Sequence, residues 1–159
     1  MGCIATSGFL IYRHVLPDSV DDFFIFCKQS REDVDHVLVH CSFTWRIWST
    51  IFLWWGVSWL APQSFQSFFL YWFNTPGSKS TKIVWSAILF SMIWNIWISR
   101  NAAIFYNGQP NWSSVVEASL VNVAQWVRVF FGSSDFSVND FLFNIDGVKG
   151  LKLARNGAV

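Results

Sequence analysis

The stretch KSTKIVWSAILFSMIWNIWISRNAAIFY, residues 79–106, decides the fold class of this chain. Its apolar side chains fall on nearly all sides of a helical projection, which is typical of a helix that its neighbours bury. Asn107, Gly108 and Pro110 follow the stretch and are typical of a helix end. We therefore expect residues 79–106 to be the longest and the central helix of a mainly α-helical fold.

Part of this stretch raises an alternative, a membrane span over residues 83–99. These residues carry no charge between Lys82 and Arg100, and they reach the lower length limit for a helix that crosses a bilayer. Asn95 and three serines lie among them, which favours a buried core helix. A small membrane protein that spans about 83–99 stays open as the alternative.

Two aromatic-rich helices are expected before the central one. Apolar residues at steps of three and four predict a helix over 43–55, with Ser42 as its cap and Gly56 at its end. Pro62 is expected to begin a shorter helix over 63–73, because proline is favoured in a first helical turn. The tryptophans at helical spacing are predicted to lie in the core: Trp45, Trp48, Trp55, Trp94 and Trp97.

One further helix and a tail follow the central helix. Residues 114–131 repeat apolar side chains at helical steps, and Ser114 with Glu117 has the spacing of a capping box. Residues 133–159 are rich in Gly, Asn, Asp and Ser, which predicts a weakly ordered tail. A short strand is expected between residues 135 and 145 of that tail.

The composition excludes bulk disorder and a strong general attraction for nucleic acids. Hydrophobic residues make up 53% and aromatic residues 19% of the 159 residues, which is enough to build a core. Lys and Arg number 11 and Asp and Glu number 10, so the net charge of +1 offers no field to attract a polyanion. We expect one domain over residues 1–132.

The cysteine count and the N-terminal sequence indicate an intracellular protein, nuclear or cytoplasmic. Three cysteines, an odd number, argue against a disulfide framework, and residues 1–16 lack the pattern of a signal peptide. Gly2 and Cys3 fit a short pattern for lipid attachment, but such a pattern often arises by chance. Lipidation of these two residues is left open.

Cys27, His36 and Cys41 form the one set of residues with the chemistry of a binding site. Thiolate and imidazole are ligands that zinc prefers, and closely spaced ligands let a metal replace a core that a short segment cannot build. Structural zinc sites have four ligands, whereas only three are evident here. From spacing alone, two free cysteines and a solvated histidine are the simpler interpretation.

The run from Cys27 to Trp48 resembles the zinc-binding domain that follows the polymerase in plant-type, LINE-like non-LTR retrotransposon reverse transcriptases. That family reads Cys-x-x-Cys, then a polar stretch with Glu, then His-Leu-Phe-x-x-Cys and an apolar stretch that ends in Trp. Five residues of this chain fall on those positions: Glu32, His36, Cys41, Phe43 and Trp48.

Two flanking blocks extend the resemblance over residues 10–105. LIYRHVLP, residues 10–17, is similar to the Leu-x-x-Arg-x-x-Leu approach of the family. WNIWISRNAAIF, residues 94–105, is similar to its Trp-x-x-Trp-x-x-Arg-Asn-x-x-x-Phe helix. The resemblance implies a zinc-knuckle-like segment over 24–41 followed by Trp- and Phe-rich helices, in a module that helps to hold RNA or DNA beside the polymerase.

One position departs from the pattern of the family, because Phe24 stands where its first cysteine would be. The resemblance therefore implies Cys27, His36 and Cys41 as metal ligands, with the fourth ligand missing at Phe24. Loss of one thiolate removes a large part of the binding free energy of a zinc site. We expect zinc to bind weakly or not at all.

No catalytic set accompanies these residues, so we expect that the chain by itself is not an enzyme. The sequence contains no glycine-rich phosphate loop and no Gly-x-Ser-x-Gly elbow. The resemblance implies a non-catalytic remnant of a retrotransposon protein, with weak and non-specific contact to RNA or DNA. The alternatives are the membrane protein described above and a helical protein-interaction module that uses its aromatic faces.

Overall fold

The computed structural model describes residues 5–17, 19–74, 76–131, 138–144 and 146–147. Their regular elements are helices, in this order: α1 (Ser7–Tyr12), the π-helical turn η1 (His36–His40), α2 (Ser42–Trp55), α3 (Phe65–Phe73), α4 (Lys79–Tyr106), α5 (Trp112–Phe131) and α6 (Val138–Phe143). Among the described residues β-pairing is limited to one isolated antiparallel bridge, between Phe23 and Arg31. The predicted mainly α class is therefore confirmed.

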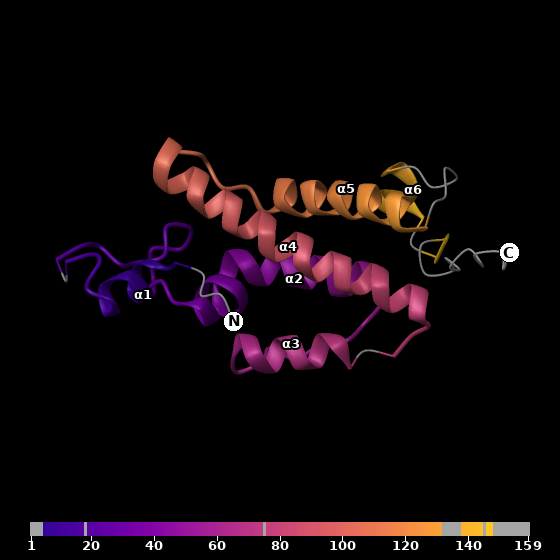
Figure 1. Cartoon of the computed structure of the whole chain (residues 1–159), viewed down its shortest axis with the longest axis horizontal. Helices are drawn as coiled ribbons and strands as arrows, with labels where there is room; N and C mark the ends of the chain where they lie inside the picture. The colour runs from indigo at the N-terminus through magenta and orange to yellow at the C-terminus, as the bar shows by residue number, and fades with distance from the viewer. Residues whose placement is uncertain (1–4, 18, 75, 132–137, 145, 148–159) are drawn as a thin grey trace, which may run out of the picture.

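The long helix α4 organises the other helices (Figure 1). It runs antiparallel to α5, while α3 lies on its opposite side and α2 packs against α5. The bounds predicted for this helix, 79–106, are confirmed. The Ser78 side chain caps it by accepting the N–H of Thr81, and Asn107 ends it in a left-handed conformation with φ 52°.

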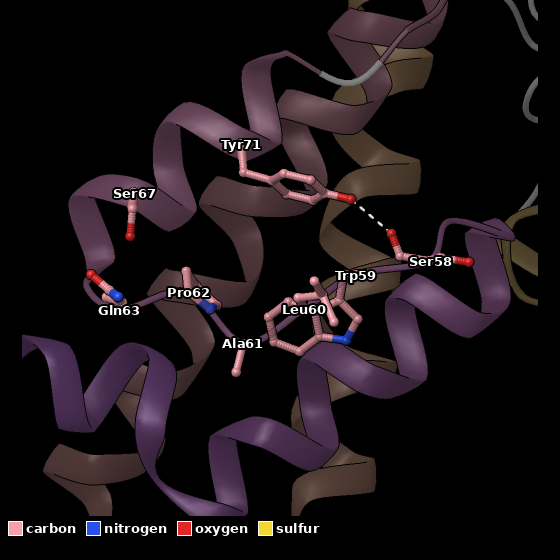
Figure 2. A pocket seen from close by; sticks show the side chains of 8 residues that line it. All are labelled: Ser58, Trp59, Leu60, Ala61, Pro62, Gln63, Ser67 and Tyr71. Atoms are coloured by element: carbon pink, nitrogen blue, oxygen red, sulfur yellow. Dashed lines mark hydrogen bonds between the residues drawn. The ribbon is translucent and has the colours of Figure 1, made fainter.

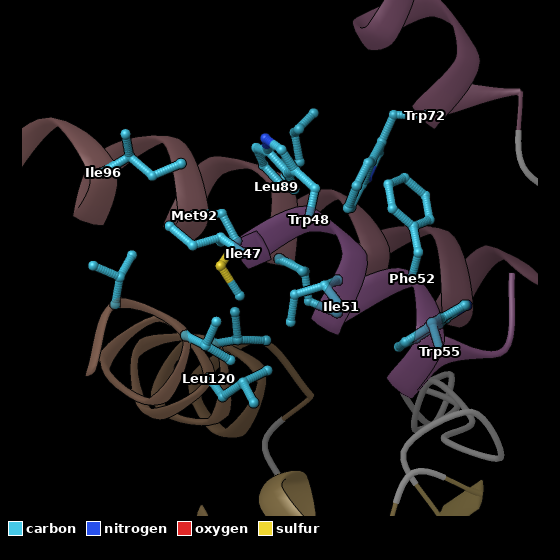
Figure 3. Close-up of a cluster of buried hydrophobic side chains, with 14 of the residues drawn as sticks. Ile47, Trp48, Ile51, Phe52, Trp55, Trp72, Leu89, Met92, Ile96 and Leu120 are labelled. Carbon is cyan, nitrogen blue, oxygen red and sulfur yellow. The ribbon is translucent and has the colours of Figure 1, made fainter. Parts of the chain in front are cut away.

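Aromatic and aliphatic side chains share the core between α2, α3 and α4, and Trp48, Phe52 and Trp72 lie near one another in it (Figure 3). Trp72 of α3 and Trp85 of α4 stack with ring centroids 3.9 Å apart and planes at 7°. Each indole N–H also donates to the backbone carbonyl of the other residue, at 2.9 and 3.2 Å. Trp48 of α2 meets Trp72 edge-on and donates its indole N–H to the Leu38 carbonyl at 2.6 Å. These buried polar groups are satisfied, as a dry core requires.

The prediction for the tryptophans is confirmed at two positions and wrong at two others. Trp48 and Trp55 are buried, whereas Trp45 is 38% exposed and Trp94 is 56% exposed. Trp97 is half-buried and stacks under the guanidinium of Arg100, 4.8 Å from the ring centroid. Helical spacing finds one face of a helix, but it does not say how many neighbours the protein supplies to cover that face.

Three helix starts differ from the prediction, and in α3 and α5 other side chains make the capping contacts. Cys41, not Ser42, is the cap of α2. Ser64 caps α3 through reciprocal bonds with Ser67, so α3 begins after Pro62 rather than at it. The Asn111 side chain accepts the N–H of Ser113, so α5 begins at Trp112, two residues early.

The tail also differs from the prediction where it is described. Residues 138–143 form the helix α6, which packs against α5, so the strand expected within 135–145 is wrong. Phe141 is fully buried and belongs to the core, which explains why this segment takes a helical form against α5. The rest of the predicted tail lies outside the described residues.

Candidate metal centre

The three candidate ligands, 9 and 5 residues apart in sequence, converge in space. The Sγ atoms of Cys27 and Cys41 and a ring nitrogen of His36 all lie within 4.8 Å of one another. The Cys27 Sγ and the His36 Nε2 are 3.1 Å apart. Ligand atoms around one zinc ion lie about 3.5–3.8 Å apart, given Zn–S near 2.3 Å and Zn–N near 2.0 Å. The cluster is therefore close to the dimensions of a metal site.

A tight turn places Cys27. The bridge between Phe23 and Arg31 aligns the two sides of this turn, and the Phe24 carbonyl accepts the N–H of Lys28 at 2.9 Å. Lys28 takes a left-handed conformation with φ 53°, which is unfavourable for a residue with a Cβ. The N–H of Gln29 consequently points at the Cys27 sulfur, at 3.5 Å. A thiolate at Cys27 would gain from that donor.

The π-helical turn η1 brings the other two ligands to the same side. The N–H of Cys41 donates to the His36 carbonyl five residues back, at 2.9 Å. An α-helix would close one residue earlier and would leave the two side chains on different faces. The Asp33 side chain holds the start of the turn by accepting the N–H of His36 at 2.8 Å. π-Helical turns of this kind are frequent at functional sites.

Burial changes the pKa values of His36 and Cys41 in opposite directions. It lowers the pKa of His36, against the opposite effect of the Asp33 carboxylate, and so favours the neutral imidazole that binds metals. Burial raises the pKa of Cys41 to about 11, although the backbone N–H groups of Phe43 and Thr44 act in the other direction. Without a cation Cys41 is a thiol, and a bound metal would have to displace its proton.

Phe24, at the position where the resemblance implies a fourth ligand, is an apolar neighbour of His36. Its side chain is fully buried, with the ring centroid 5.7 Å from the His36 ring in an edge-on contact and 4.8 Å from Phe26. Phe26 in turn packs on Phe43 at 4.3 Å. Apolar rings thus border the cluster where a fourth thiolate would stand. The donors present, two thiols and one imidazole, fit a soft or borderline metal ion with three protein ligands.

A buried ion pair lies beside this segment and joins it to α4. Arg100 donates to Glu32 through both Nε, at 3.2 Å to Oε2, and Nη2, at 2.5 Å to Oε1. The two side chains are 6% and 1% exposed. Glu32 also accepts the backbone N–H of Ser7 at 2.9 Å, so its carboxylate fixes α1 as well. Bidentate pairing of this kind satisfies two charges that neither residue could bury alone.

The sequence names both partners of this pair but not their pairing. Glu32 lies in the block around the ligands and Arg100 in the block on the long helix, 68 residues apart. In the sequence, each of these two residues is noticeable only because it falls on a motif position of the resemblance. A charged residue in the middle of an apolar helix is nevertheless a signal, because Arg is almost never fully buried unless it is paired.

A surface pocket lies elsewhere, over the loop between α2 and α3 (Figure 2). It measures about 620 Å³, and these residues line it: Ser58, Trp59, Leu60, Ala61, Pro62, Gln63, Ser67 and Tyr71. The Tyr71 hydroxyl donates to the Ser58 carbonyl at 2.7 Å. The lining contains the hydroxyls of Ser58, Ser67 and Tyr71 but neither a carboxylate nor a thiol nor an imidazole, so no general base of these kinds lines the pocket beside the hydroxyls.

No protein-family model, no curated protein and no solved structure matches the chain.

Proposed function

We propose that this chain is a non-catalytic module of the type found behind the polymerase of LINE-like retrotransposon reverse transcriptases, with a metal site that has lost one ligand. The ion pair of Glu32 and Arg100 is the observation that carries this proposal. The two residues belong to different blocks of the resemblance, and they form one buried contact. If the likeness in the two blocks had arisen by chance, there would be no reason for Glu32 and Arg100 to form a buried pair.

The metal cluster supports the same proposal through its place in the fold. Between residues 21 and 36 only Phe24 and Glu32 are buried, so this segment has little core of its own. A metal on Cys27, His36 and Cys41 would tie the segment to the start of α2, because Cys41 caps that helix. Zinc is the ion implied by the resemblance, held with reduced affinity by three protein ligands.

Zinc competition with a chromophoric chelator tests the role of Phe24. We expect the unmodified chain to lose zinc to the chelator and Phe24→Cys to retain one zinc, with affinity higher by at least about 100-fold. Phe26→Cys is the matched control, since it adds a thiol two residues away. Stoichiometric, chelator-resistant zinc in the unmodified chain would contradict the role of Phe24. Equal zinc affinity in both cysteine variants would contradict the proposed module.

Contact with nucleic acid is proposed to be weak, because the cations near the cluster are already partnered. Lys28 lies 4.0 Å from Asp21, and Arg31 lies 3.4 Å from Asp22. Exposed pairs of this kind contribute little to stability, but they lower the positive charge that a phosphate backbone would meet. Arg46 is a further cation that lies near the cluster in the sequence.

The exposed face of α4 favours a second candidate function, a helical interaction module. Phe90, Trp94 and Ile98 follow one another at four-residue steps and are 51%, 56% and 45% exposed. Of the helices searched in the described residues, α4 is also long and apolar enough to cross a membrane, with 44% of its most apolar window buried inside the fold. A core helix passes that same test, so it is weak support for a span.

Carbonate extraction separates the two uses of this face. A protein that associates through Phe90, Trp94 and Ile98 with another protein is released from membranes by alkaline carbonate. A chain that spans the bilayer through α4 stays in the pellet, and that outcome would contradict both the module and the packed fold around α4.

A further inference from the structure

We propose that the cluster of Cys27, His36 and Cys41 is a three-coordinate site whose preferred ion is copper(I), and that Phe24 sets this preference. The inference rests on the metal binding proposed above and names its ion. The three donor atoms lie within 4.8 Å of one another, and no fourth His, Cys, Asp or Glu joins them among the described residues. Copper(I) is a soft ion that thiolates select and that is stable with three ligands, whereas structural zinc requires four.

The surroundings of the cluster disfavour the fourth ligand that zinc would need. The Phe24 ring is fully buried and meets the His36 ring edge-on, and Phe26 continues the apolar wall. Neither ring can donate electrons to zinc as a thiolate would, and neither offers a hydrogen bond to a zinc-bound water. Three-coordinate copper(I) needs no ligand from this side.

With copper(I) the site would keep a negative charge, which backbone N–H donors can stabilise. Two thiolates, one neutral imidazole and one copper(I) carry a net charge of −1. The N–H of Gln29 points at the Cys27 sulfur, and Cys41 is the residue at the N-terminal end of α2. This N–H group and the positive end of α2 stabilise the remaining negative charge.

The test is an anaerobic titration of the reduced chain with copper(I) alone, in competition with bicinchoninate, followed by X-ray absorption spectroscopy. We expect one copper(I) per chain, bound by two sulfurs and one nitrogen. Cys27→Ser should abolish this site, and His36→Gln should lower the affinity at least about tenfold. Phe24→Leu preserves an apolar wall and should keep copper(I) binding. Two-coordinate copper with unchanged affinity in His36→Gln would overturn the three-coordinate site.

Zinc titrations of the same proteins separate this inference from the proposed function. Zinc that displaces copper(I) from the unmodified chain at equal concentration would overturn the copper preference and leave the module standing. Failure of the unmodified chain to bind either ion, with zinc bound by Phe24→Cys, would also overturn the copper site and support the module. If Phe24→Cys is folded by circular dichroism but binds no zinc, the result contradicts both the copper(I) site and the proposed module.

Discussion

The segment of residues 21–36 and the helices α2 to α5 are held in place by different contacts. The helices share a core of stacked rings, with Trp72 and Trp85 at its centre. The segment relies on a cluster of two sulfurs and an imidazole, and on the buried pair of Glu32 and Arg100. Ring packing is spread over many contacts, whereas each polar contact of the segment depends on one partner.

This difference has an energetic consequence. Loss of one ring removes apolar burial and leaves a cavity that neighbouring rings partly fill. Loss of one member of a buried ion pair leaves the other charge without compensation in a poorly solvated place. The helices should therefore tolerate substitution better than the segment does, residue for residue.

The largest expected effect is that of Arg100→Met. The change leaves the Glu32 carboxylate, now 1% exposed, with the Ser7 N–H in place of its ionic partner. We expect a loss of about 3–5 kcal/mol in the free energy of unfolding, measured by urea denaturation. The double variant Glu32→Leu with Arg100→Met should recover most of this loss. Equal instability of the single and the double variant would show that the arginine acts through packing alone.

A smaller effect is expected for Trp72→Phe, inside the core of the helices. The phenyl ring keeps much of the stack on Trp85 but cannot donate to its backbone carbonyl. The free energy of unfolding should fall by about 1–3 kcal/mol. Trp94→Phe is the matched control on the exposed face of α4 and should stay within about 0.5 kcal/mol of the unmodified chain. Equal losses at the two positions would contradict the assignment of core and surface.

The smallest effect is expected for the binding of single-stranded RNA. The two cations of the segment, Lys28 and Arg31, lie beside carboxylates. We expect a Kd no better than about 10⁻⁴–10⁻⁶ M at physiological salt, with about two or three phosphate contacts in the salt dependence. Fluorescence anisotropy at two salt concentrations measures both quantities. Nanomolar, sequence-dependent binding would mean that exposed rings such as Trp45 and Trp94 form a recognition surface.

The helices could be predicted from the sequence because their signals are local. Apolar spacing with Asn107 and Gly108 at the end gave the bounds of α4, and Gly56 correctly ended α2 with φ 75°. The starts of α3 and α5 were misplaced, since several neighbouring Ser and Asn residues can serve as caps and local sequence does not rank them, and α2 begins one residue early without a side-chain cap. The helix α6 was missed because its stability comes from packing of Phe141 on the core.

The candidate site could be predicted in its residues but not in its environment. The sequence named Cys27, His36 and Cys41 from their chemistry, and the structure brings all three together. Neither the π-helical turn that aligns His36 with Cys41 nor the pairing of Glu32 with Arg100 has a local sequence signal. Both depend on contacts between segments that only the folded chain brings together.

We predict that Cys27, His36 and Cys41 form one metal site with no fourth ligand from the described residues. Cobalt(II) tests it most directly, because its charge-transfer absorption reports thiolate ligands and its visible bands report coordination geometry. At saturating cobalt we predict thiolate bands in the unmodified chain, weaker in Cys27→Ser and in Cys41→Ser, and intense tetrahedral bands in Phe24→Cys. Thiolate bands that are absent from the unmodified chain, or that persist unchanged in both serine variants, would contradict the account.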